Sequence, residues 1–406
     1  MNRAYKFRLY PKRHQIETLD KTLMLCRRLY NASLEQRITV YKMGQTVSYT
    51  AQANELPALK RELPEFNSVF SQVLQDTLRR LDKSYANFFR RTKEKKSKAG
   101  FPRFKSSNRF KSITYPQAGF QILENGHLEL SKVGTIRMFM HREIVGTVKT
   151  CTIKRDAVGD WYAVFTVELP DAPKRKVKTA IGVDLGLKNL AMLSTGESIL
   201  HPKFLRASEA RIKIIQQEVS RKKKGSNNRR KCARRLAKAH RRVERQRDDF
   251  LHKASRALSM KADAIVFENL NINGMLKNHR LAKSISDVSW GKLMQFTHYK
   301  AASAGGAVYY VNPSGTSQIC SRCGETVKKP LSERNHTCPN CGFSSDRDIN
   351  AALNILGRLP ADSGELLKTP VETMPLPPSY RTASNVGEAG GPAPDAFMQG
   401  LAIRQP

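Results

Sequence analysis

Four of the seven cysteines have the spacing of a metal site. Two residues separate Cys320 from Cys323 and Cys338 from Cys341, and 14 residues lie between the pairs. Two such pairs can close a tetrahedral shell of thiolates around Zn²⁺. Because four protein ligands leave no open position, the predicted zinc is structural. His336 lies near the second pair and is a competing ligand, and redox chemistry of the thiols is the alternative to metal binding.

Three acidic residues can carry a different chemistry. Asp184 and Glu268 each end a hydrophobic segment that is typical of a buried strand, and Asp348 stands at the start of a predicted helix. Each acid alone is more typical of a turn, a cap or the surface. Together they can converge on one edge of a sheet and hold two divalent cations, and hard carboxylate oxygens suit Mg²⁺ or Mn²⁺. Such ions activate water for attack on a phosphodiester, so the acids predict hydrolysis of nucleic acid.

The net charge indicates a polyanionic partner. The 406 residues include 71 Lys and Arg but only 35 Asp and Glu, a formal charge of +36. Solubility alone requires a net charge of only about 2 to 8, and nucleic acid is the usual partner of so basic a chain. The segment 357–406 has 8 Pro, 6 Gly and nearly balanced charges, a composition typical of a disordered tail.

The elements that must position these residues can be read from the apolar pattern. A period of two at Tyr5, Phe7 and Leu9 predicts a half-buried strand, and the same period over 134–169 predicts a small β-rich domain. Apolar residues recur at helical spacing from Phe70 to Phe88, which indicates an amphipathic helix packed on a core.

Two basic segments are candidate nucleic-acid contacts. Residues 203–253 hold 19 Lys and Arg against 5 Asp and Glu over a helical pattern broken near Gly225, which predicts a basic helical hairpin. With so few acids to form ion pairs along the helix, a phosphate backbone is the simpler counter-charge. In residues 90–105, aromatic residues interleave with cations; such a segment can bind phosphates and stack bases, or it is a solvated loop.

No run of about 18 apolar residues is present, and the N-terminus lacks the apolar core of a signal peptide. An odd number of cysteines in a long chain argues against a disulfide framework. We therefore expect a cytoplasmic protein, associated with the nucleoid, with no membrane partner.

Several motifs resemble those of TnpB, the OrfB-type, transposon-encoded nuclease family that is related to the type V CRISPR effectors. The resemblance covers residues 4–356 and keeps the family's motif order. The segments that carry it are Leu9-Tyr10-Pro11, Tyr30-Asn31, Phe88-Phe89-Arg90-Arg91, Gly100-Phe101-Pro102-Arg103-Phe104, 181–189, 266–270, 316–324 and 346–355.

The resemblance implies a multi-domain α/β protein with a RuvC-like, ribonuclease-H-type nuclease domain interrupted by a zinc ribbon. It also implies a β-barrel wedge domain that carries a helical recognition insertion. The expected parts are the first wedge strand (1–12), the recognition lobe (13–115), the rest of the wedge barrel (116–172), the main nuclease part (173–314), the zinc ribbon (315–344), the final nuclease helix (345–357) and a disordered tail (358–406).

The same resemblance implies an RNA-guided DNA endonuclease. Asp184, Glu268 and Asp348 match the catalytic acids, and Asp346 is the rival for the third place. A guide RNA from the transposon end and double-stranded target DNA are the implied partners, and the protein itself would read a short DNA motif beside the target. Two other functions stay open: a nucleic-acid-binding accessory or regulatory factor of transposition that does not cleave, and a DDE-type transposase that joins strands.

Overall fold

The structure, a computed structural model, describes residues 1–94, 99–330, 333–360 and 403–404. The chain divides into two compact units, Met1–Pro170 and Asp171–Pro406. Of the expected tail 358–406, all but 358–360 and 403–404 lies outside the described residues.

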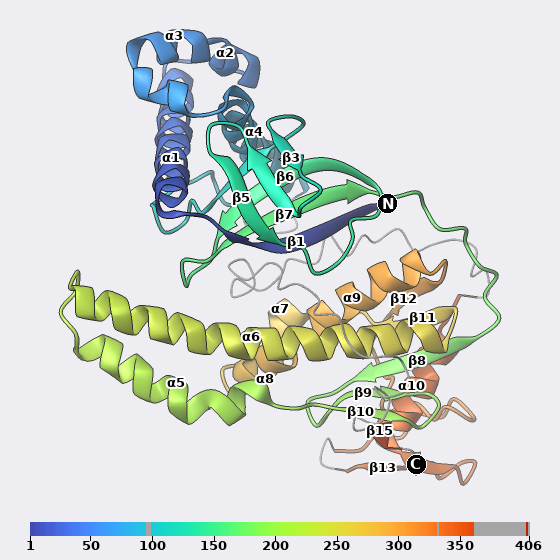
Figure 1. Cartoon of the computed structure of the whole chain (residues 1–406). Coiled ribbons are helices and arrows are strands. Elements are labelled where there is room, and N and C mark those ends of the chain that lie inside the picture. The colour runs from blue at the N-terminus through green and yellow to red at the C-terminus, as the bar shows by residue number, and fades with distance from the viewer. Residues whose placement is uncertain (95–98, 331–332, 361–402, 405–406) are drawn as a thin grey trace. The chain divides into compact units, whose positions relative to one another are not determined.

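The first unit is built on a seven-stranded antiparallel sheet that curls on itself (Figure 1). Its central strand is β1, which pairs with β7 on one side and β5 on the other. Tyr5, Phe7 and Leu9 point into the core, as their alternation predicts. The strands are β1 (Asn2–Tyr10), β2 (Ser112–Tyr115), β3 (Phe120–Ile122), β4 (His127–Leu130), β5 (Gly134–Phe139), β6 (Thr147–Arg155) and β7 (Trp161–Glu168), in the spatial order β2-β6-β7-β1-β5-β4-β3.

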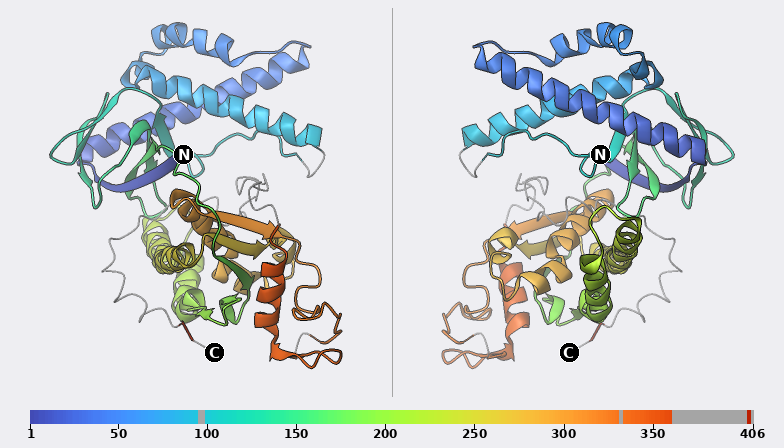
Figure 2. Two further views of the ribbon diagram at one scale, coloured as in Figure 1. Left: turned by 90° about the vertical axis from the view of Figure 1, so that its right-hand side faces the viewer. Right: turned by 90° about the vertical axis from the view of Figure 1, so that its left-hand side faces the viewer.

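Helices fill the sequence between β1 and β2. They are α1 (Arg13–Lys42), α2 (Tyr49–Asn54), α3 (Leu56–Glu62), the 3-10 helix η1 (Pro64–Ser68) and α4 (Ser71–Glu94). The long helices α1 and α4 pack against each other (Figure 2). Because β2 joins the sheet, the helical segment ends earlier than the expected boundary at residue 115.

The second unit has a mixed sheet with the strand order β12-β11-β8-β9-β10-β15. β8, β9 and β10 form an antiparallel meander, and β11 and β12 continue the sheet beyond β8 in parallel. All five residues of β11 are buried, as the apolar run around them predicts. The strands are β8 (Ala180–Leu185), β9 (Asn189–Leu193), β10 (Ser198–Leu200), β11 (Ala264–Glu268), β12 (Ala307–Val311) and β15 (Ile403–Arg404).

The helices of this unit include the hairpin of α5 (Phe204–Arg221) and α6 (Asn227–Lys261), over the residues where the charge pattern predicts it. The others are α7 (Ile272–Met275), α8 (Ala282–Val288), α9 (Trp290–Ser303) and α10 (Arg347–Gly357), with the small strands β13 (Asn335–Thr337) and β14 (Ser344–Asp346) before α10. Among the helices that the structure describes, none has the length and apolar character needed to cross a membrane.

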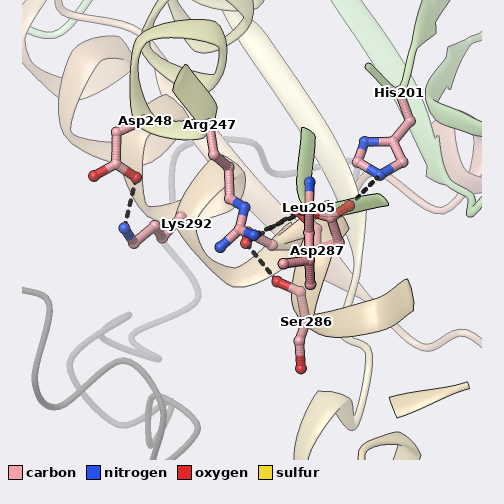
Figure 3. A network of polar contacts seen from close by, with 8 residues as sticks. His201, Leu205, Arg247, Asp248, Ser286, Asp287 and Lys292 are labelled. Atoms are coloured by element: carbon pink, nitrogen blue, oxygen red, sulfur yellow. Dashed lines mark hydrogen bonds and ion pairs between the residues drawn. The ribbon is translucent and has the colours of Figure 1, made fainter. Parts of the chain in front are cut away.

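Buried ion pairs attach α6 to α8 and α9 (Figure 3). The Lys292 ammonium group donates to Asp248 at 2.6 Å, and Arg247 donates to Asp287 at 2.8 Å. The second carboxylate oxygen of Asp287 lies 3.7 Å from Nε2 of His201. Removing one partner of a buried pair leaves an uncompensated charge in the core, so the loss of either partner is expected to destabilise the unit.

Candidate functional site

Asp184 and Glu268 lie at the ends of two neighbouring parallel strands, β8 and β11. The register pairs Gly182 with Val266 and Val183 with Phe267, and its continuation places Glu268 beside Asp184. Since side chains alternate along a strand, the two carboxylates project from the same face of the sheet. Glu268 is 6 % exposed and Asp184 is half-buried.

Helix α10 packs closely on β8 and brings the third acid to this face. Gly182 permits the approach, because a Cβ there would overlap the carbonyl oxygen of Ala352 and lie 2.8 Å from the backbone nitrogen of Leu356. Asp348 is in the first turn of α10 and is therefore carried to the end of β8 where Asp184 lies.

The charges of Glu268 and Asp348 act on Asp184. Burial, and then the negative charges of Glu268 and Asp348, raise the pKa of Asp184 from 3.8 to about 7, against the opposing charge of Arg347. Burial also raises the pKa of Glu268, while a hydrogen bond from Thr316 and the charge of Arg358 act against that rise. A charge shifts the pKa of another group only at short range, so Asp184 lies near both Glu268 and Asp348.

The structure gives Asp346 and Asp348 different surroundings. Asp346 is the N-cap of α10, and its side chain accepts the backbone N–H groups of Asp348 at 2.7 Å and Ile349 at 3.4 Å. Asp346 is exposed. Asp348 forms two ion pairs: its Oδ2 lies 3.6 Å from Nη1 of Arg334, and its Oδ1 lies 3.6 Å from Nε of Arg347. A carboxylate that already caps a helix has fewer lone pairs free for a cation, which favours Asp348 over its rival.

The three acids supply hard carboxylate oxygens, which are the donors that divalent cations such as Mg²⁺ prefer. The ligand atoms of the three acids are farther apart than those of the four thiols. Across the part of the chain that the structure describes, the four cysteines alone form a group of three or more metal-ligating side chains whose ligand atoms all lie within 4.8 Å of one another.

The four cysteines are arranged as a zinc site requires. Sγ of Cys320 lies 3.7 Å from that of Cys341, and Sγ of Cys323 lies 3.6 Å from that of Cys338. Four sulfurs at about 2.3 Å from a central Zn²⁺ are about 3.8 Å apart in a tetrahedron, close to these distances. The competing ligand His336 is buried outside this group, with Nδ1 2.9 Å from Nζ of Lys329.

Both cysteine pairs form the same turn. The N–H of Gly324 donates to the carbonyl of Cys320 at 2.9 Å, and that of Gly342 donates to Cys338 at 3.0 Å. The two glycines have φ of 79° and 69°, in the left-handed region that glycine adopts without strain. In the second turn, the N–H of Cys341 helps to lower the pKa of the Cys338 thiol to about 7, whereas, against a hydrogen bond from Phe343, burial and the neighbouring sulfurs raise the pKa of the Cys341 thiol.

Three further residues contact Glu268 or the segment beside it, and no sequence pattern predicted a role for them. Thr316 donates a hydrogen bond to Glu268, and Asn350 and Asn354 of α10 bind the backbone of the segment that contains Thr316. The four-residue spacing of the two asparagines is the sequence signal that points to a shared helix face.

An exposed aromatic surface lies at the end of α4 and on the loop that follows. We call it the aromatic ledge; its members Phe89, Phe101 and Phe104 are 61, 46 and 52 % exposed. The ring centroid of Phe101 lies 5.6 Å from that of Tyr85. The side chain of Asn31 fixes the loop by exchanging two hydrogen bonds with the backbone of residue 105, at 2.8 and 3.1 Å.

Three protein families match parts of the chain. A family described as "Probable transposase" matches residues 164–279, a "Cas12f1-like, TNB domain" matches 290–355, and a "Helix-turn-helix domain" matches 1–46. Over 1–46 the structure has the strand β1 followed by the single 30-residue helix α1.

The chain is also similar to whole proteins. A "Putative RNA-guided DNA endonuclease" of Streptomyces pristinaespiralis is 38 % identical over 88 % of this chain and 89 % of that protein. The "Putative RNA-guided DNA endonuclease InsQ" of Escherichia coli K12 is 30 % identical over 90 % of this chain and 95 % of that protein. Among solved structures, the Cas12f1-sgRNA-target DNA complex matches with a TM-score of 0.33 and 16 % identity, over 88 % of this chain and 99 % of that one.

Proposed function

We propose that this chain, which belongs to the TnpB family, is an RNA-guided DNA endonuclease of a transposable element. The observation that carries the proposed reaction is the meeting of Asp184, Glu268 and Asp348 at one end of the mixed sheet. The antiparallel meander β8-β9-β10, continued by the parallel strands β11 and β12, supports a RuvC-like, ribonuclease-H-type domain. Its reaction is the hydrolysis of a DNA phosphodiester.

The three acids would hold Mg²⁺ or Mn²⁺, and such ions would supply an activated water and a counter-charge for the leaving oxygen. The protein prepares this site before a cation arrives. Burial and the charges of the other two acids raise the pKa of Asp184 to about 7, so ionising this carboxyl group is costly until a cation binds. Glu268 is held by the hydroxyl of Thr316, which leaves its second oxygen available as a ligand.

Other parts of the chain would bind the nucleic acids. The helices α5 and α6 carry most of the 19 Lys and Arg within 203–253, and phosphates of RNA or DNA would neutralise them. The aromatic ledge offers exposed rings, and the sequence around them is rich in Lys and Arg, a combination suited to stacking unpaired bases. Pairing between a guide RNA from the transposon end and the target strand would select the sequence, and the protein would read a short adjoining DNA motif.

The test begins with the RNA that co-purifies with the protein from its host. We expect a discrete RNA that ends in a variable guide segment. A complex assembled with a chosen guide is then incubated with matching DNA and Mg²⁺, and we expect a double-strand break that Asp184→Ala abolishes while RNA binding persists.

Three results would contradict the proposal in different ways. Cleavage that persists unchanged in Asp184→Ala would remove the active-site assignment. Binding of nucleic acid without a cut product under any divalent metal would favour the accessory or regulatory role. Strand-transfer products would indicate a transposase.

A further inference from the structure

We propose that Thr316, Asn350 and Asn354 are positioning residues that tie the zinc ribbon to the nuclease carboxylates. Through them, the folding of the first cysteine turn sets the orientation of Glu268. This inference rests on the proposed function, because it concerns how the same site is assembled.

The contact between Thr316 and Glu268 is buried on both sides. Oγ1 of Thr316 donates to Oε1 of Glu268 and also lies 3.2 Å from the carbonyl oxygen of Pro313. A hydroxyl has one proton, and a charged carboxylate is the stronger acceptor of the two. Because both side chains are almost fully shielded from water, no solvent molecule replaces this bond when it is lost. Without it, the Glu268 carboxylate has no hydroxyl to select its rotamer.

Helix α10 holds the backbone around Thr316 with a stripe of side chains. Asn350 is fully buried; its Oδ1 accepts the N–H of Ser321 at 2.9 Å, and its Nδ2 donates to the carbonyl of Ile319 at 2.8 Å. Asn354, one turn later, donates to the carbonyls of Thr316 at 2.8 Å and of Ile319 at 2.6 Å. Residues four apart on a helix share a face, so both amides meet the same segment.

Arg358 extends the stripe by one more turn. It donates to the carbonyls of Asn312 and Ser314, the latter at 2.8 Å. The segment 312–321 is therefore attached to α10 along its length, and α10 also carries Asp348. Two of the three acids are thus positioned by the same set of contacts.

One predicted zinc ligand, Cys320, is part of this segment. Cys320 follows Thr316 by four residues, and Asn350 binds the residues on either side of Cys320. If metal did not close the first cysteine turn, the hydrogen bond between Ser321 and Asn350 would be lost. Only three residues separate Cys320 from Thr316, so a shift of the backbone at Cys320 would also move Thr316. The ribbon therefore orients Glu268 as well as stabilising its own fold.

The test uses Thr316→Val, which keeps the shape of the side chain and removes the hydroxyl, and Thr316→Ser, which keeps the hydroxyl. The matched control is Thr326→Val at an exposed position of the same ribbon. For the full-length protein with its RNA, four quantities are measured: zinc content, melting temperature, RNA-bound fraction and the affinity for Mn²⁺ followed by electron paramagnetic resonance. Guided cleavage is measured as a function of Mg²⁺ concentration.

For Thr316→Val we expect unchanged zinc content and RNA binding, a cleavage rate and Mn²⁺ affinity lower by about 10- to 100-fold, and a higher Mg²⁺ requirement. Thr316→Ser is expected to recover both within a few-fold, and Thr326→Val to behave as wild type. Wild-type Mn²⁺ affinity and Mg²⁺ requirement in Thr316→Val would overturn the inference, as would a loss of zinc and melting temperature that accounts for the whole effect. If the wild-type complex itself never cuts DNA, the proposed function fails, and the Mn²⁺ affinities still decide whether Thr316 positions Glu268.

Discussion

Replacing Asp184 by Asn is expected to stabilise the protein at pH 8 when no divalent cation is bound to the acids. Burial and the charges of Glu268 and Asp348 raise the pKa of Asp184 from 3.8 in an unfolded chain to about 7 in the folded one. Between these values the folded state retains a proton that the unfolded state has lost. The stabilising contribution of the protonated group is therefore complete below pH 3.8 and disappears as the pH rises to about 7.

The size of the effect follows from the two pKa values. They differ by about three pH units, and each unit corresponds to about 1.4 kcal/mol, so the ceiling is about 4 kcal/mol in the free energy of unfolding. Asp184 is only half-buried, and water and side-chain rearrangement will relieve part of the repulsion. We therefore expect Asp184→Asn to gain about 1 to 2 kcal/mol at pH 8, which raises the melting temperature by a few degrees.

The assay is thermal unfolding of the wild type and the variant at pH 5 and pH 8 in metal-depleted buffer. A chelator must be avoided, because it would also remove the structural zinc. The two pKa values make the gain at pH 5 about half of that at pH 8, or somewhat less than half. Millimolar Mg²⁺ should reduce or reverse it, because the cation binds the wild-type acids and stabilises the folded state by mass action.

The control is Asp346→Asn, since asparagine caps a helix as well as aspartate does and Asp346 is exposed. This variant should unfold close to the wild type at both pH values. A gain for Asp184→Asn that is equal at pH 5 and pH 8, or absent at pH 8, would refute the electrostatic reasoning.

Three further predictions concern the packing, the zinc and the nucleic-acid surface. Gly182→Ala should lower the free energy of unfolding by about 3 kcal/mol or more, because the added Cβ overlaps the backbone of α10. The measurements are thermal unfolding and soluble yield, and the control is Gly357→Ala, where the added Cβ meets open space. Cys320→Ser should lower both the zinc content, measured by mass spectrometry of the metal, and the melting temperature, and full zinc content in the variant would show that the ligand is misassigned. Phe89→Ala should weaken binding of single-stranded RNA by about 5- to 100-fold if one base stacks on this ring; Tyr41→Ala, at a side chain 74 % exposed, should leave the affinity unchanged.

The local elements and the chemistry-bearing residues were predictable from neighbours in the sequence. Alternation at Tyr5, Phe7 and Leu9 predicted β1, and the apolar run before Glu268 predicted β11. These predictions need only the apolar pattern of a single strand, which consecutive residues of the sequence show directly. The cysteine spacing likewise predicted the thiol cluster, because each pair closes within a single turn.

The helical stripe from Phe70 to Phe88 shows where such a prediction stops. The period places its members from Leu74 to Phe88 on one face of α4, which begins one residue after Phe70. The structure buries that face from Leu74 to Leu81 but leaves Phe88 and its neighbour Phe89 partly or largely exposed. A period identifies a face; what covers each turn of that face depends on elements distant in the sequence.

Residue types, spacing and charge in the sequence predicted what this protein binds: zinc at four thiols, a cation at three acids, and a polyanion. The tertiary structure decided how those groups work together. It set Asp184 beside Glu268, brought α10 against Gly182 and placed Thr316 on the carboxylate it orients. These contacts join residues tens to more than a hundred positions apart, and their geometry follows from strand order and helix packing, which no local pattern encodes.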